Sequence, residues 1–448
     1  MKRILAFVLV FSFTLPVFAQ KQLTIQEAIS IALKRNSSLI KLKNNYESSK
    51  SQVLNAYGQL IPNLAVQGGW SWYRVNDIGG IQRDFFGQDV QVPPSQTDTR
   101  SYDVGLGGSF TLFNGLSNYE TINQAKNNVK ASEYNLSKQK QNIVYETTDF
   151  FYLALNAAEL LKVRDENVQY YKKFLETVQE RNKLGAVAVA DVYSAQVQLG
   201  NAELQSIQAQ NDNETIKNNL LNFLALNVMD EYTFVDPFGT DKAVDTDKYM
   251  KDFQDIQTMV SAALDSRFDY KSQEATLDAA RNGINSAKGG IYQSLTGLYQ
   301  YYTYAADFNS LFNRKTFNVG LTLNVPIFSN FNVENQIQMA EVSYNNARED
   351  LSVLERQVKI DVKQGFNDLV AAKKTLDVAV NNAIYAEETR KINQERYNLG
   401  SATILDVLQA GRDFTDAQRN KINAIYDFYR QHDKLTNSLG RLDFSKYE

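Results

Sequence analysis

Two long runs constrain this chain more than any other feature of its sequence. Residues 116–184 contain neither glycine nor proline, and residues 331–399 contain no proline. Because little in them interrupts a helix, each run predicts one helix, roughly 100 Å long at 1.5 Å per residue. In the first run Thr147, Phe151 and Ala154 follow one another at a spacing typical of helices wound around each other.

A turn motif ends each run, and its two copies match. Glu180–Ala195 and Glu395–Ala410 are identical at seven of sixteen positions, 215 residues apart. Each copy ends its long helix at a Leu-Gly pair, where glycine favours a left-handed cap. A new helix then starts near an Asp-Val pair. We therefore interpret both copies as the tips of helical hairpins.

The rest of the chain repeats as well. Residues 29–64 align without gaps to 260–295 at an offset of 231, and residues 102–197 align to 317–412 at an offset of 215. The smaller second offset means that a loop in the first copy is longer. The pattern therefore predicts a tandem repeat of helix, two strands, long helix and return helix, which is a mainly α fold with a small β part.

Periodicity also predicts the bounds of these elements. The expected organisation is a first repeat over 20–226 (strands 64–75 and 102–113, long helix 116–184, return helix 189–226), a connector over 227–253, and a second repeat over 254–448 (strands 294–305 and 316–327, long helix 331–399, return helix 404–439). Residues 76–100 are rich in Gly, Pro, Asp and Gln and predict a long exposed loop. Ser117 and Glu120, three residues apart, predict a capping box at the start of the first long helix.

The first nineteen residues predict an exported protein. Lys2 and Arg3 precede an apolar stretch, and Val17-Phe18-Ala19 offers a cleavage site, so residues 1–19 are interpreted as a signal peptide. Its removal leaves 45 basic against 51 acidic side chains, and this net charge of −6 argues against a nucleic-acid partner. The chain has no cysteine, so an exported protein of this kind must be stabilised by packing or by assembly.

Alternation with a period of two gives the four predicted strands one apolar and one polar face. We expect the apolar set to face lipid: Leu64, Val66, Trp70, Trp72, Tyr102, Val104, Leu106, Phe110, Phe317, Val319, Leu321 and Leu323. No sufficiently long apolar run follows the signal peptide, so any membrane span must use these strands. Four strands cannot close a barrel, and open edges in lipid would leave backbone groups unsatisfied, so such a chain must oligomerise.

From about Leu23 to Leu439 the sequence resembles the TolC family of outer-membrane efflux and secretion channels. The resemblance rests on Leu23–Ile29 with Ala32-Leu33, on Phe113-Asn114-Gly115, and on both tips with their Leu-Gly and Asp-Val pairs. It implies a homotrimer in the outer membrane of a Gram-negative bacterium, with twelve strands in a shared membrane β-barrel and twelve helices in a periplasmic tunnel. The implied partners are a periplasmic adaptor protein, an inner-membrane pump reached through that adaptor, and outer-membrane lipid.

The resemblance also assigns roles to the tips. It implies a periplasmic aperture at Asp191, Asp406 and Tyr397, with Arg181 and Arg396 as expected partners of the carboxylates, and adaptor docking at Leu184, Gly185, Val187, Leu399, Gly400 and Ala402. Simpler structural roles are also open, because glycine caps long helices and the helix dipole favours a carboxylate in a first turn. The best-known family pattern has further charges where this chain has Ala402 and Gln409, so we expect a less charged aperture.

The expected function is that of the exit duct of a tripartite efflux pump exporting small molecules. Two alternatives stay open: the outer component of a type I protein secretion system, and a non-channel surface protein built from coiled helices. An enzyme is not expected, because the chain has no phosphate-binding loop and its single histidine, His432, has no triad partner and is predicted to face solvent. No cofactor and no metal site are predicted.

Overall fold

The structure is a computed structural model, and it describes residues 21–237, 244–253 and 255–447. The predicted signal peptide lies outside the described residues, as does the middle of the predicted connector. The chain divides into two compact units. The first unit is formed by the described residues within Met1–Lys41, Ser137–Arg267 and Gln357–Glu448, and the second contains Leu42–Leu136 and Phe268–Arg356.

The helices of the two repeats correspond closely in length and position. α3 (Ser117–Lys183) and α8 (Asn332–Asn398) have 67 residues each, and the return helices α4 (Val189–Phe223) and α9 (Ile404–Ser438) have 35 each. In the same way α1 (Ile25–Arg35) and α2 (Ser37–Gly58) correspond to α6 (Ile256–Ser266) and α7 (Phe268–Lys288). The mainly α class and the tandem repeat are confirmed.

The second long run is not free of glycine, yet the helix continues through it. Gly365 lies inside α8. A Cβ at this position would come within 3.3 Å of the Leu435 side chain. Glycine therefore permits a close approach of α9 here, and the neighbouring turns keep the helix intact.

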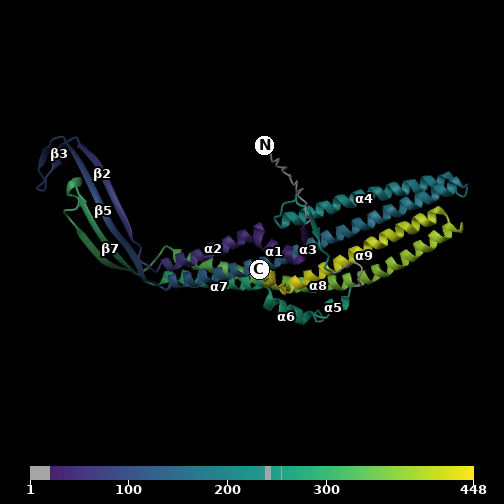
Figure 1. The fold of residues 1–448 in the computed structure, drawn as a ribbon. Helices are drawn as coiled ribbons and strands as arrows, with labels where there is room; N and C mark the ends of the chain where they lie inside the picture. The colour runs from purple at the N-terminus through teal and green to yellow at the C-terminus, as the bar shows by residue number, and fades with distance from the viewer. Residues whose placement is uncertain (1–20, 238–243, 254, 448) are drawn as a thin grey trace, which may run out of the picture. The chain divides into compact units, whose positions relative to one another are not determined.

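The second unit contains a four-stranded antiparallel sheet in the order β2-β5-β7-β8. Its strands are β2 (Ala65–Asp77), β5 (Ser95–Asn114), β7 (Ser294–Ala305) and β8 (Thr316–Asn324). The β5–β7 pair joins the hairpins of the two repeats and leaves β2 and β8 as edges. Helical segments adjoin all four strands at one end of the sheet, and both hairpin connections lie at the other end (Figure 1).

The prediction of a long loop at 76–100 was wrong. β2 continues to Asp77, β5 already begins at Ser95, and β3 (Gly80–Arg83) and β4 (Asp89–Val92) pair with each other between them. Antiparallel pairing uses backbone N–H and C=O groups, which polar residues supply as well as apolar ones. Composition alone therefore misread this segment.

The predicted capping box at the start of α3 was also wrong. The Ser117 hydroxyl lies 2.9 Å from the hydroxyl of Ser286, and the Glu120 carboxylate accepts a 2.7 Å hydrogen bond from Asn282. Both side chains thus bond to α7, which packs along this part of α3. The Asn114 side chain instead accepts a 3.3 Å hydrogen bond from a backbone N–H in the first turn.

In the first unit the four long segments form a layer in the order α4, α3, α9 and α8 (Figure 1). Neighbours are joined by side-chain bonds in the pairs Arg164–Gln205 (α3 to α4), Arg430–Asp149 (α9 to α3) and Lys434–Asp368 (α9 to α8), at 2.7, 2.6 and 3.0 Å. Large apolar side chains such as Phe151, Leu220 and Phe428 are fully buried between these helices and α1. α4 and α8 are the outer members of this layer.

Smaller elements close the first unit. β1 (Lys21–Leu23) pairs in parallel with β6 (Tyr232–Phe234), and α5 (Thr246–Met250) follows in the predicted connector.

The prediction that His432 faces solvent was wrong. Its side chain is 23% exposed, and its ring lies 5.0 Å from that of Tyr249 on α5. Three short 3₁₀ turns complete the fold: Gly289–Ile291, Phe308–Ser310 and Ser445–Tyr447. Among the described residues, no helix is both long enough and apolar enough to cross a membrane.

Candidate functional site: the paired helix tips

Both tips end their long helix in the same hydrogen-bonded glycine turn. In the first tip (residues 180–191) and the second tip (residues 395–406), Gly185 and Gly400 have φ angles of 72° and 74°. The N–H of each glycine bonds to the carbonyl three residues back, and the next N–H bonds to the carbonyl five residues back. This Schellman arrangement satisfies carbonyl groups that a helix end otherwise leaves free.

The six predicted docking residues divide into two groups. Leu184 and Leu399 are 83% and 81% exposed, and a Cβ at either glycine of the tips would meet no atom within 4 Å. Val187 and Ala402 instead pack against a buried apolar cluster. Of the six predicted docking residues, the Leu-Gly pair of each tip is therefore the fully accessible part.

That buried cluster, the tip core, holds side chains from all four helices: Tyr171, Phe174, Val178, Ala195, Ala202, Tyr397, Ile404, Val407 and Leu408. Tyr397, predicted to line the aperture, belongs to it and is 4% exposed. Burial raises the pKa of the Tyr397 phenol, and the charge of nearby Asp191 adds to this rise. In a single chain Tyr397 is thus a core residue, and the charge of Asp191 is close enough to act on its phenol.

Arg181 joins the first tip to the second. Its guanidinium donates a 3.0 Å hydrogen bond to the backbone carbonyl of Tyr397 and another to that of Asn398. It also lies 5.1 Å from the centre of the Tyr397 ring, in cation–π contact. These carbonyls are at the C-terminal end of α8, where the helix dipole favours a cation. Arg181 therefore binds a helix end where a carboxylate was expected.

Arg396, which corresponds to Arg181 in the second repeat, stays on its own tip. Its guanidinium donates to the backbone carbonyl of Ser401 at 3.2 Å and to the side-chain oxygen of Asn393 at 3.5 Å. Within the described part of one chain, neither arginine forms an ion pair with Asp191 or Asp406. The two tips are alike in backbone and different in how their arginines are used.

The two aspartates also differ. Asp406 accepts hydrogen bonds from the Thr403 N–H and hydroxyl, both at 2.8 Å, and Thr403 accepts one in return at 3.3 Å. This capping box lowers the pKa of Asp406. Asp191 lies in the first turn of α4, where the capping position is Ala188 and makes no side-chain cap bond. The sequence interpretation missed Thr403, although Thr-x-x-Asp is a readable capping signal.

The sheet gathers the predicted lipid-facing residues on one face. Directly opposite residues of neighbouring strands point the same way, and the register pairs Val66 with Leu106, Leu106 with Tyr301 and Tyr301 with Phe317. Apart from Leu64, which precedes β2, all residues of the predicted lipid-facing set lie on the same side of the sheet as these pairs. We call this side the apolar sheet face. The opposite face carries polar side chains such as Gln67, Asp103, Gln300 and Asn318.

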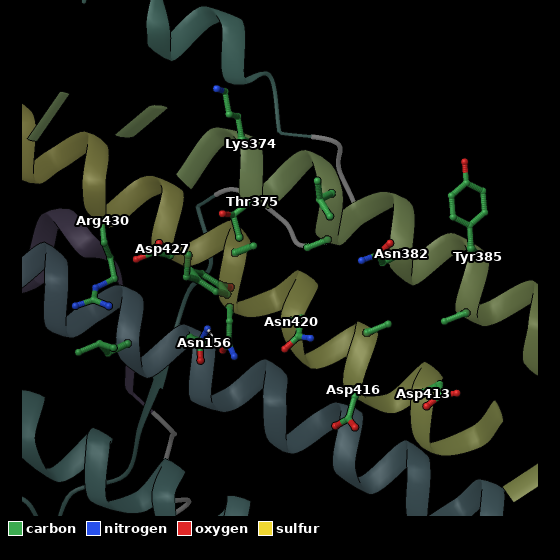
Figure 2. Close-up of a pocket in the computed structure, with 18 residues that line it drawn as sticks. Asn156, Lys374, Thr375, Asn382, Tyr385, Asp413, Asp416, Asn420, Asp427 and Arg430 are labelled. Carbon is green, nitrogen blue, oxygen red and sulfur yellow. Dashed lines mark hydrogen bonds between the residues drawn. The ribbon is translucent and has the colours of Figure 1, made fainter. Parts of the chain in front are cut away.

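A groove of about 1030 Å³ lies between α3, α8 and α9, and no sequence signal predicted it (Figure 2). Its lining is rich in amides, including Asn156, Asn382 and Asn420, with several charged side chains around them. Charged members have partners outside the groove, as Arg430 has in Asp149 at 2.6 Å. In the described ranges no three or more metal-ligating side chains come together. The tips, by contrast, combine exposed apolar pairs with charge.

Comparison with known proteins agrees with these features. The model of the outer membrane efflux protein family matches residues 28–226 and 259–441, one block in each repeat. The chain belongs to the outer membrane efflux protein family. It is an outer-membrane efflux channel protein, as the sequence predicted, and its family is one of channels. The two matched blocks correspond to the tandem repeat.

Individual relatives and structures of this family are distant in sequence but similar in fold. Outer membrane protein TolC of Escherichia coli (strain K12) is 22% identical over 375 residues, covering 76% of this chain and 74% of that protein. Outer membrane efflux protein BepC of Brucella suis is 20% identical over 344 residues, 76% and 72% of the two chains. The CmeC outer membrane channel of Campylobacter jejuni superposes with a TM-score of 0.79 at 18% identity, over 94% and 88%. VceC of Vibrio cholerae superposes with a TM-score of 0.77 at 17% identity, over 93% of this chain and 96% of that chain.

Removing the Arg181 side chain should loosen the attachment between the tips. Arg181→Ala loses two hydrogen bonds from a charged group and a cation–π contact, worth about 1–3 kcal/mol together at a partly exposed site. The chain has no cysteine, so spin labels at Lys183→Cys and at the exposed Leu405→Cys report the distance between the tips by pulsed electron paramagnetic resonance. We expect a broader and longer distance distribution in Arg181→Ala.

Arg396→Ala is the matched control, because it removes the corresponding arginine without touching the other tip. Its distance distribution should stay close to that of the parent protein. Equal broadening in both variants, or none in Arg181→Ala, would show that Arg181 does not hold the tips together.

Proposed function

We propose that three copies of this chain close into a ring, and that this ring is the exit duct of a tripartite efflux pump. The proposal rests on the outer elements of the sheet and of the helical layer. Each layer ends in two different elements, and among the described residues neither of them has a neighbour on its outward side. Because the two edges of each layer differ, copies join head to tail, and such joining closes into a ring when the rotation fits. No catalytic step is assigned to the chain.

The sheet supplies the first pair of edges. β2 and β8 each have a neighbour on one side only, so their outward N–H and C=O groups are free to pair. In lipid each unpaired group would cost several kcal/mol, which excludes an open sheet there. With the apolar sheet face outward, β8 of one copy would pair with β2 of the next, and the strands of all copies would share one membrane β-barrel.

The helical layer supplies the second pair. The outer side of α4 carries an exposed apolar row made of Val189, Tyr193, Val197, Leu204 and Ile207, and that of α8 carries Ile360, Val378, Tyr385 and Ile392. Val378, Tyr385 and Ile392 recur at intervals of seven residues, as in coiled-coil seams, and Ile360 lies five helical turns before Val378. Contiguous apolar rows of this kind mark interaction surfaces. We infer that α4 of one copy packs on α8 of the next in a periplasmic tunnel.

The number of copies comes from the family resemblance and agrees with the strand count. Membrane barrels of the outer-membrane type start at about eight strands, so one copy with four strands is too few. Three copies would supply twelve. Among the relatives, BepC is named an efflux protein, which favours efflux of small molecules over type I protein secretion for this chain.

In such a ring the tips form the periplasmic mouth, and Asp191 supplies its principal free charge. Asp406 is held in its capping box with Thr403, so its carboxylate is already engaged in ending the turn. Asp191 makes no such bond and lies close enough to Tyr397 to affect its pKa. We infer that Asp191, which lies near the buried Tyr397, narrows the aperture while Arg181 fixes the second tip beside the first.

Single-channel recordings in planar bilayers test this arrangement. The parent protein should give discrete, cation-selective conductance steps, because several carboxylates at a narrow mouth attract cations. Asp191→Ala should reduce the preference for cations over anions, and Asp406→Ala should reduce it less. Gln409→Ala changes no charge and is the control. A parent protein without conductance would refute the channel, and an unchanged selectivity in Asp191→Ala would refute the role of Asp191.

We further propose that the adaptor docks on the two exposed Leu-Gly pairs. These pairs are accessible, their glycines leave room for a close backbone approach, and the Schellman turns hold them rigidly. A partner ending in a helical hairpin would bury both leucines. The same repeated surface would thus be presented by both hairpins of every copy.

Exchanging the exposed leucines tests the docking surface without disturbing the glycine turns. Leu184→Ser with Leu399→Ser should lose the adaptor when the tagged channel is purified from its native membrane and its partners are identified by mass spectrometry. Lys183→Ser with Asn398→Ser changes the neighbouring exposed side chains and should retain it. Undiminished recovery of the adaptor with the leucine variant would place docking elsewhere.

A further inference from the structure

The β3–β4 hairpin ends in an apolar tip that a channel does not require. Phe85 and Phe86 stand side by side in its turn and are 98% and 85% exposed. Their ring centres are 5.8 Å apart, in an edge-to-face arrangement. Two adjacent phenylalanine rings in contact with water are unfavourable, because removing large apolar side chains from water stabilises a protein.

The turn that carries these rings is rigidly built. The Asp84 carboxylate accepts hydrogen bonds from the N–H of Phe86 at 3.0 Å and from that of Gln88 at 2.8 Å. Gly87 supplies the positive φ of 81° that closes the turn. The backbone of the turn is therefore ordered, and little backbone conformational entropy is lost when the rings bind.

Immediately behind the turn, one side of the hairpin carries an ion pair. Arg83 and Asp89 form an ion pair at 3.1 Å, directly opposite each other. Farther along, Ile81 is opposite Gln91 and Gln82 is opposite Val90, so each face mixes apolar and polar residues. Neither face of the hairpin is therefore apolar along its length, as binding in a protein groove would require. Its end is apolar, and the Arg83–Asp89 ion pair, which we call the charged collar, lies immediately behind that end.

The hairpin follows the point where the apolar sheet face gives way to charge. Along β2 this face ends with Trp70 and Trp72, and the next residue on it, Arg74, makes a two-bonded ion pair with Asp98 of β5 at 2.7 and 2.9 Å. Aromatic rings followed by charges mark a membrane–water boundary. β3 begins a few residues beyond that boundary, on the side of the sheet away from the helices.

We propose that Phe85 and Phe86 insert into the lipid surface of the outer leaflet and anchor the outer rim of the channel there. This inference rests on the proposed function, which places the sheet in the membrane. A lipid surface accepts an apolar end of this size, and the Arg83–Asp89 collar stops insertion at the head groups. We infer a lipid surface as the partner because only the end of the hairpin is apolar, while both of its faces carry polar residues.

Site-directed spin labelling tests the insertion in the whole protein reconstituted in phospholipid vesicles. Because the chain has no cysteine, Phe86→Cys and Gln91→Cys each give a single labelled site. Collision with oxygen, which dissolves in lipid, is compared with collision with a water-soluble nickel chelate. We expect the oxygen-to-nickel ratio to be several-fold higher at position 86 than at position 91, which lies behind the collar.

The outcomes separate this inference from the proposed function. Conductance is measured on the same labelled protein, so a conducting channel with position 86 as exposed to nickel as position 91 would overturn the lipid anchor alone. Disulfide-linked copies of unlabelled Phe86→Cys would also overturn it, because the tip would then contact a second copy. A protein without conductance would overturn the proposed function, and the anchor with it.

Discussion

Unpaired backbone groups on the two edge strands are the constraint on which the rest of this protein depends. β2 and β8 close the sheet order on either side, and neither has a second neighbour among the described residues. Where the apolar sheet face lies in lipid, each free N–H or C=O group on its edges would cost several kcal/mol. In the ring that we propose, β2 of one copy pairs with β8 of the next and removes this cost.

The helical layer meets the same constraint with different chemistry. The backbone N–H and C=O groups inside α4 and α8 are hydrogen-bonded within each helix. The outer sides of these two helices, however, carry exposed apolar rows. In the ring that we propose, head-to-tail contacts would bury these apolar rows between neighbouring copies. Such contacts would be driven by the hydrophobic effect in the helical layer, as they would be by backbone hydrogen bonding in the sheet.

Duplication has produced two tips with the same backbone and different attachments. Both end in a glycine turn with a positive φ, but only Arg181 reaches across to the other helix end. Only the second tip has a side-chain cap on its return helix, from Thr403. The first tip therefore holds the second, and its own return helix starts without a side-chain cap. This asymmetry makes each repeat a natural control for the other.

The sequence predicted most of the fold because its strongest signals are local. A long run with almost no helix breakers allowed α3 and α8 to be bounded within one residue at each end. The strand at 294–305 coincides with β7 for the same reason, since alternation is a local pattern. Residues 76–100 were misread because glycine and proline indicate turns but not the backbone pairing between them.

The tips show what local signals cannot supply. The acceptor of Arg181 is a backbone carbonyl 216 residues away. Every residue has such a carbonyl, so the identity of the residues does not reveal which one accepts this hydrogen bond. The burial of Tyr397 likewise depends on four helices meeting in the tip core. Thr403 could have been predicted from its spacing to Asp406. The capping role of Asp406 was therefore accessible from sequence, and the attachment made by Arg181 was not.

Cross-linking between the two edge strands tests the central claim most directly. A chain without native cysteine can carry one cysteine in β2, at Gly68, and one in β8, at Val319 or its neighbours on the same face. If copies join head to tail in a closed ring, oxidation should link chains up to a trimer only when both cysteines are in the same chain, and either one alone should give no linked product. Dimers from a single cysteine, or chains that stay unlinked with both, would contradict the ring.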